Sequence, residues 1–183
     1  METIRFTSND LPQDFATEVR QATGEDVFHC YQCGNCTAGC PYTEFFDCTV
    51  SQIMRLIQTG QREKALGSRA LWLCATCETC STRCPCEIDV AGVMDGLRNI
   101  AYREKRFTEK DVRTFYEAFL TSLKRHGRIF ELEIIARYNL KSGHLITDVD
   151  LGPKVMKQLH FLPKRIKGRA DIARIFNRFA EKK

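Results

Sequence analysis

The sequence predicts an all-α protein, and two observations lead to this prediction. Apolar residues recur at helical spacing in the long segments, and no stretch between the two cysteine-rich segments alternates apolar and polar residues as a half-buried strand would. With 183 residues, 43% of them hydrophobic, the chain can bury a moderate core without disulfides. We expect one compact domain with a further helical part appended to it.

The first helix is predicted in CTVSQIMRLIQTG, residues 48–60. Four apolar residues fall at i, i+3, i+4 and i+7 of one helix face: Val50, Ile53, Met54 and Ile57. Gly60 is a natural helix stop. Good helix formers continue through residues 61–72. The helical period then returns after the second cysteine segment, in Val90, Val93, Leu97, Ile100 and Ala101.

Three more helices are predicted towards the C-terminus. Thr108 and Asp111 resemble a capping box, and Gly127 closes the helix that they begin. Its apolar face comprises Val112, Phe115, Tyr116, Phe119, Leu120 and Leu123. Residues 128–140 are also expected to be helical. The last helix has an apolar stripe of Ile172, Ile175, Phe176 and Phe179 opposite the cations of Arg174, Arg178 and Lys182.

Ten cysteines are more than packing requires, and eight of them form an internal duplication. CYQCGNCTAGCP at residues 30–41 and CATCETCSTRCP at residues 74–85 share one cysteine spacing at an offset of 44 residues. A cubane 4Fe-4S cluster needs a thiolate at each of four iron corners. Three cysteines at this spacing let one loop wrap three corners, and in the bacterial ferredoxin pattern the fourth cysteine of each run binds the other cluster.

The duplication therefore predicts two 4Fe-4S clusters that exchange one ligand. We assign the first cluster to Cys30, Cys33, Cys36 and Cys84, and the second to Cys74, Cys77, Cys80 and Cys40. Structural zinc would use two C-x2-C pairs, leaving the third and fourth cysteines and both prolines without a purpose. Disulfides are disfavoured because three-residue spacing suits a shared centre better than pairing. With every iron corner occupied, we assign no catalytic residue.

The two cysteine loops differ in ways that predict unequal reduction potentials. The first contains Gly34 and Gly39, which let backbone N–H groups approach cluster sulfur, and the second has Thr76 and Glu78 among its side chains. His29 is interpreted as a neighbour of the cluster rather than a ligand.

Two cysteines, Cys48 and Cys86, lie outside the repeat. They are interpreted as packing thiols, with a third metal or redox site as the alternative. We expect residues 1–106 to form the dicluster domain and residues 107–183 a C-terminal helical region for subunit docking. The last helix would either pack on its own domain or dock on a partner subunit.

Charge and hydropathy exclude several other classes of protein. The N-terminus lacks a basic start followed by an apolar run, so a secretory signal is not expected. We expect a reducing, cytoplasmic location instead. Charged residues interrupt every hydrophobic segment, so no membrane span is predicted. The net charge of +5 is unevenly spread, because residues 150–183 contain 10 Lys and Arg but 3 Asp and Glu, and it does not predict nucleic-acid binding. The chain has no nucleophile triad, phosphate loop or dinucleotide-binding glycine motif.

Several phrases make the chain resemble the C subunits of heterodisulfide reductases, a family of α-helical ferredoxins. They are the first cysteine run, the second run in the form LWLCATCETCSTRCP, GRIFELEIIARYNL at residues 127–140, LGPKVMKQL at residues 151–159 and LPKRIKG at residues 162–168. The cysteine runs alone would fit many dicluster proteins, and the C-terminal phrases narrow the choice.

The resemblance implies an electron-transfer subunit, without catalytic residues of its own, of an oxidoreductase acting on a sulfur group. In that family, two 4Fe-4S clusters relay single electrons from a flavin-containing A subunit to a B subunit that reduces a disulfide. In methanogens the disulfide is formed by coenzymes M and B, and a hydrogenase or formate dehydrogenase module can be a further partner. The eight motif cysteines match the family ligands one by one.

Two alternatives from the residues remain open. The iron–sulfur subunit of a quinone-linked dehydrogenase, of the fumarate reductase or glycerol-3-phosphate dehydrogenase type, has a similar helical dicluster but commonly carries additional modules. An iron–sulfur sensor that binds nucleic acid through its basic tail is less consistent with two fully ligated clusters.

Overall fold

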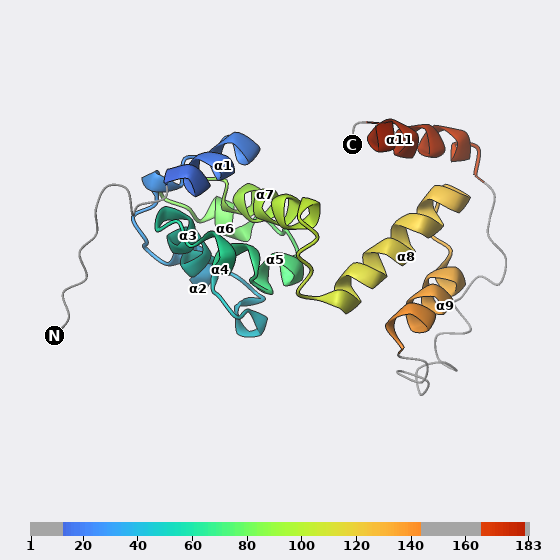
Figure 1. Ribbon diagram of the computed structural model, residues 1–183, viewed down its shortest axis with the longest axis horizontal. Helices are drawn as coiled ribbons and strands as arrows, with labels where there is room; N and C mark the ends of the chain where they lie inside the picture. The colour runs from blue at the N-terminus through green and yellow to red at the C-terminus, as the bar shows by residue number, and fades with distance from the viewer. Residues whose placement is uncertain (1–12, 144–165, 182–183) are drawn as a thin grey trace. The chain divides into compact units, whose positions relative to one another are not determined.

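The computed structural model describes residues 13–143 and 166–181, and these residues fold into helices without a β-strand (Figure 1). The all-α prediction is therefore confirmed. The helices are α1 (Gln13–Thr23), η1 (Val27–His29), α2 (Asn35–Ala38), η2 (Thr43–Phe45), α3 (Val50–Gln58), α4 (Arg62–Leu66), α5 (Ala70–Leu73), α6 (Thr79–Thr82), α7 (Val90–Arg103), α8 (Lys110–His126), α9 (Glu131–Ser142) and α11 (Arg169–Glu181).

The chain divides into two compact units, Met1–Glu109 and Lys110–Lys183. The boundary expected after residue 106 and the docking role of residues 107–183 stay predictions. The phrase at residues 151–159 and the start of the phrase at residues 162–168 lie outside the described residues. Among the helices that the structure describes, none is both long and apolar enough to cross a bilayer.

In the first unit, α1, α3 and α7 pack together around the buried core (Figure 1). Helix α3 begins at a capping box, because the Thr49 side chain accepts from the Gln52 N–H and the Gln52 side chain accepts from the Thr49 N–H. The helix ends at Thr59, and Gly60 follows with a φ of 66°. The predicted stop at Gly60 is thus confirmed.

Helices α3 and α7 repeat each other at an offset of 40 residues, in the same way that the two cysteine runs repeat at 44. Thr49 caps α3 and Asp89 caps α7. The matching core positions are occupied by Val50 and Val90, Ile53 and Val93, Met54 and Met94, and Ile57 and Leu97, and all eight side chains are at most 2% exposed. The duplication therefore includes the helix after each cysteine run.

Polar and aromatic contacts connect helices at the surface of this unit. The Arg62 guanidinium binds the carboxylates of Glu18 in α1 and of Glu104 at the end of α7. Hydrogen bonds to these two carboxylates raise the pKa of Arg62 above its ordinary value. Burial acts in the opposite direction, but its effect is smaller. The Phe107 ring packs on Trp72 of α5, with ring centroids 5.3 Å apart.

The second unit is built on the pair α8 and α9, with α11 packed against α8. Helix α8 begins at Lys110, slightly after the start expected from Thr108, and ends before Gly127, whose φ is 76°. The buried hydroxyl of Ser122 accepts the N–H of Phe130 at 3.0 Å and so fixes the connection to α9. In α11, Ile172 and Phe176 are half-buried and Ile175 is exposed.

Glu133 is the polar centre of the α8–α9 pair. Its carboxylate binds Arg125 at 2.6 Å, His126 at 2.8 Å and Arg137 at 2.9 Å. Burial raises the pKa of Glu133, but the three hydrogen bonds outweigh this effect and lower it to about 2. Because the folded pKa lies below the unfolded one, the resulting stability is present above about pH 4.3 and is lost as the pH falls towards 2.

The substitution Glu133→Gln tests this ion cluster. We expect it to lower the free energy of unfolding by about 2 kcal/mol at pH 7, measured by anaerobic chemical denaturation followed by helical circular dichroism. The difference between the wild type and the variant should shrink as the pH falls from 5 towards 3. A difference that is independent of pH over this range would contradict the assignment. Glu131→Gln, in the first turn of the same helix, is the matched control.

Candidate metal centres

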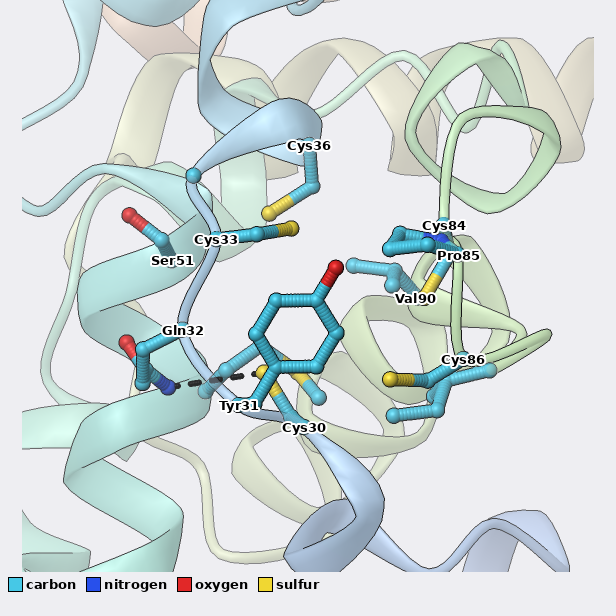
Figure 2. A pocket seen from close by; sticks show the side chains of 13 residues that line it. Cys30, Tyr31, Gln32, Cys33, Cys36, Ser51, Cys84, Pro85, Cys86 and Val90 are labelled. Atoms are coloured by element: carbon cyan, nitrogen blue, oxygen red, sulfur yellow. Dashed lines mark hydrogen bonds between the residues drawn. The ribbon is translucent and has the colours of Figure 1, made fainter.

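The four cysteines predicted for the first cluster line one pocket of the first unit. Cys30, Cys33 and Cys36 come from the first loop, and Cys84 comes from the end of the second cysteine run. Figure 2 shows their sulfur atoms directed towards the same space. The wall is completed by apolar side chains of the following helices, among them Met54 and Val90.

The four cysteines predicted for the second cluster line a second pocket. Cys74, Cys77 and Cys80 come from the second loop, and Cys40 comes from the end of the first run. Each pocket therefore has three cysteines of one run and the fourth cysteine of the other. Coordination of clusters by these two sets of four stays a prediction, and the arrangement of the side chains is compatible with it.

The two loops have the same unusual backbone at matching positions. Gln32 and Thr76 have φ angles of 64° and 50°, and Gly34 and Glu78 have φ angles of 80° and 62°. A left-handed conformation costs a residue other than glycine about 1 kcal/mol. Three of the four positions are not glycine, so packing of the surrounding structure holds the loops in this shape. The shape turns each loop around its pocket.

A hydroxyl group after the third cysteine of each run ties the loop to the next long helix. The Thr37 hydroxyl oxygen accepts the backbone N–H of Ser51 at 2.9 Å, at the start of α3. In the second copy, the Ser81 hydroxyl oxygen accepts the N–H of Ala91 at 2.9 Å, at the start of α7. The two bonds match residue for residue, and each satisfies a donor in the first turn of a helix.

A side chain further along each helix anchors the start of the same loop. The Gln58 amide donates to the carbonyl oxygens of Val27 at 2.9 Å and of Cys30 at 2.8 Å. The Arg98 guanidinium donates to the carbonyls of Leu71 at 2.6 Å and Cys74 at 2.7 Å. We call Gln58 and Arg98 the carbonyl anchors.

The carbonyl anchors occupy matching places in the duplication. Gln58 and Arg98 are 40 residues apart, which is the offset of the two helices, and their acceptors are 44 residues apart, which is the offset of the two cysteine runs. Each one links its helix to the backbone of the first cysteine in its loop. Reasoning from the sequence missed both residues. The signal that could have found them was the similarity of residues 49–58 to residues 89–98, which is displaced by four residues from the cysteine offset.

Asp47 positions the approach to the second loop. Its carboxylate accepts the Ser68 hydroxyl at 2.6 Å and the backbone N–H groups of Arg69 at 3.1 Å and Ala70 at 3.2 Å. Burial raises the pKa of Asp47, and the hydrogen bonds lower it by more, so the pKa lies below its ordinary value. The bonds cap α5, which leads directly into Cys74.

All ten cysteines are free thiols, and their surroundings differ. Burial raises the pKa of Cys36, and it raises that of Cys80 to about 11, with a smaller contribution from nearby Cys74. A hydrogen bond with the Thr79 hydroxyl lowers the pKa of the exposed Cys77 thiol. Thiolate is the form that binds iron, so coordination at the buried cysteines would displace their protons.

Side chains at the first pocket also contact sulfur or border its opening. The Gln32 amide donates to Cys30 Sγ at 3.5 Å. The Tyr31 ring borders the pocket in Figure 2, and its hydroxyl interacts chiefly with the Cys33 thiol. The matching residue at the second pocket is Ala75, which has no ring.

Three residues singled out in the sequence are not among the eight predicted ligands: Cys48, His29 and Cys86. Cys48 packs against the core and does not line either cysteine pocket, and exposed His29 ends η1 outside the first pocket. Cys86, in contrast, lines the first pocket with the four predicted ligands. Within residues 13–143 and 166–181, no three His, Cys, Asp or Glu side chains converge as the ligands of a single metal ion do.

Comparison with known proteins gives this region an identity. Residues 25–88 match the family described as 4Fe-4S dicluster domain. This region is therefore similar to 4Fe-4S dicluster domains. The match includes both cysteine runs, η1, α3 and the connection to α7, and it supports 4Fe-4S clusters as the cofactor, two in number.

Curated relatives confirm the resemblance noted in the sequence. The C subunit of the H2:CoB-CoM heterodisulfide,ferredoxin reductase of Methanothermobacter thermautotrophicus is 33% identical over 92 residues, 50% of each chain. The C subunit of the ferredoxin:CoB-CoM heterodisulfide reductase of Methanosarcina mazei is 38% identical over 89 residues, 48% of this chain and 53% of the relative. The chain spans about half the length of these relatives.

A more distant relative aligns with a larger part of the chain. The C2 subunit of the H2/formate:CoB-CoM heterodisulfide,ferredoxin reductase of Methanococcus maripaludis is 27% identical over 165 residues, which is 86% of this chain and 78% of the relative. The similarity therefore continues beyond the dicluster domain into the second unit.

Removing the Arg98 anchor tests the role of the long helices in holding the loops. Arg98→Ala should lower the free energy of unfolding by about 2–3 kcal/mol, because two carbonyl groups lose hydrogen bonds from a charged donor. Arg103→Ala, at an exposed position near the end of the same helix, is the control and should be within about 0.5 kcal/mol of the wild type. Anaerobic denaturation measures both, and equal stability of the two variants would contradict the anchoring role.

Proposed function

We propose that this chain is the electron-transfer iron–sulfur subunit of a heterodisulfide reductase complex, which relays single electrons from a flavin-containing A subunit to a disulfide-reducing B subunit. One observation carries the proposal: a dicluster domain has two pockets, each bordered by three cysteines of one run and the fourth of the other. The names of the relatives support the type of complex.

The donor set fits the proposed groups. Each pocket offers at least four thiols, and 4Fe-4S clusters are held by four Cys thiolates. When bound there, each cluster would supply a centre that gains or loses one electron. Cys30, Cys33, Cys36 and Cys84 would hold the first, and Cys74, Cys77, Cys80 and Cys40 the second.

The protein's own contribution is to hold the thiols and to control their surroundings. The carbonyl anchors and the hydroxyl bonds of Thr37 and Ser81 fix both loops before any partner binds. Tyr31 lines the first pocket, whereas Tyr42 and Phe46 line the second. The different side chains around the two sites support unequal reduction potentials.

The partners in this proposal are the A and B subunits, with a hydrogenase or formate dehydrogenase module as a further one, and the complex would work in the cytoplasm. The iron–sulfur subunit of a quinone-linked dehydrogenase is the second candidate, because the same dicluster arrangement would serve it. Anaerobic purification from the native source, followed by identification of the chains that co-elute, distinguishes the two. Co-elution with a quinone-reactive membrane subunit instead of A and B subunits would contradict the proposal.

Replacing one predicted ligand tests the assignment of cysteines to the two sites. Cys33→Ala should remove the first cluster and lower the iron content from about eight to about four atoms per chain, with loss of electron transfer and a lower unfolding midpoint. Cys48→Ala, which alters a cysteine outside both pockets, should keep the full iron content. Iron and sulfide analysis and anaerobic thermal unfolding provide the measurements. Full iron content in Cys33→Ala would refute the ligand assignment.

A further inference from the structure

The first pocket contains a fifth cysteine that the ligand assignment does not use. Cys86 lines this pocket with Cys30, Cys33, Cys36 and Cys84. In Figure 2 its sulfur atom points towards the space that the other four border. The side chain is half-buried and forms no disulfide, so the thiol is available to the pocket.

A tight turn brings Cys84 and Cys86 to the same pocket. The N–H of Glu87 donates to the carbonyl oxygen of Cys84 at 3.1 Å, and Glu87 has a left-handed φ of 56°. Pro85 between the two cysteines also lines the pocket. A left-handed φ is unfavourable for a residue other than glycine, and the turn that requires it at Glu87 presents two thiols, two residues apart, to one site.

The second pocket has no such thiol. The residue that matches Cys86 in the duplication is Tyr42, which lies two positions after Cys40 and lines the second pocket. The cysteines lining that pocket are the four predicted ligands alone: Cys40, Cys74, Cys77 and Cys80. The two sites thus differ in the number of thiols that reach them, five against four.

We propose that Cys86 is a reserve ligand of the first 4Fe-4S site, able to replace Cys84, and that the second site has no replacement for Cys40. The inference rests on the proposed function. In the exchange, the bond between iron and Cys84 Sγ breaks and a bond between the same iron and Cys86 Sγ forms. The Cys86 thiol gives up its proton and the released Cys84 thiolate takes one, so no oxidant or reductant is needed. A thiolate binds iron of a cluster more strongly than a hydroxyl or water does, which favours Cys86 as the replacement.

The experiment compares matched alanine variants of the full chain, prepared anaerobically. Cys84→Ala and Cys86→Ala should each keep the wild-type iron content of about eight atoms, whereas the double variant should keep about half. Cys40→Ala, which removes the corresponding ligand of the second site, should also keep about half. Electron paramagnetic resonance of the reduced proteins then shows which samples retain two cluster signals rather than one.

Alkylation gives a second readout that does not depend on iron analysis. In the wild type, Cys86 should react with iodoacetamide while Cys84 is protected, and in Cys84→Ala the remaining Cys86 should become protected. Half the iron in Cys84→Ala, or its recovery only as unfolded protein while Cys40→Ala folds, would overturn the reserve role. Full iron in the double variant would overturn it too. A wild type without iron would instead overturn the proposed function itself.

Discussion

The exchange of cysteines between two loops is the constraint on which the first unit depends. Each pocket takes three thiols from one loop and the fourth from the other, so neither pocket is complete without both halves of the duplication. The pockets therefore join segments more than thirty residues apart in the chain. Closing such loops costs conformational entropy, and metal binding by thiolates can supply folding free energy in return.

The long helices keep the two loops in the geometry that this exchange needs. Helices α3 and α7 bury matching apolar faces, and each contacts its own cysteine loop at two points, through a hydroxyl bond at its start and a carbonyl anchor further along. The same two helices therefore form part of the core and hold the loops that line the pockets. A change in the packing of α3 or α7 on the core would alter the positions of the cysteines, even though no apolar residue would bind iron.

Much of this arrangement could be predicted from the sequence, because it rests on local signals. The spacing of Val50, Ile53, Met54 and Ile57 predicted α3, Gly60 and Gly127 predicted helix ends, and the cysteine spacing predicted the pairing of the two loops. The boundary between the units and the docking role of the second one depend on surfaces that only a partner would reveal.

The parts that the sequence did not reveal depend on contacts between distant residues. Gln58 and Arg98 look like ordinary polar helix residues, and only the fold brings them to the carbonyls of Cys30 and Cys74. Cys86 lies outside the repeat pattern, and its place in the first pocket follows from the tight turn at Glu87, where a residue other than glycine takes a positive φ. Residues in left-handed conformations have no reliable signal in side-chain type when packing enforces them.

The most direct test of the exchanged ligation is an anaerobic crystal structure of the iron-loaded chain, with the anomalous scattering of iron used to locate the metal. We predict two four-iron clusters. Sulfur atoms of Cys30, Cys33, Cys36 and Cys84 should bind one, and those of Cys74, Cys77, Cys80 and Cys40 the other. A cluster bound by all four cysteines of a single run, or a single zinc ion in either pocket, would contradict it.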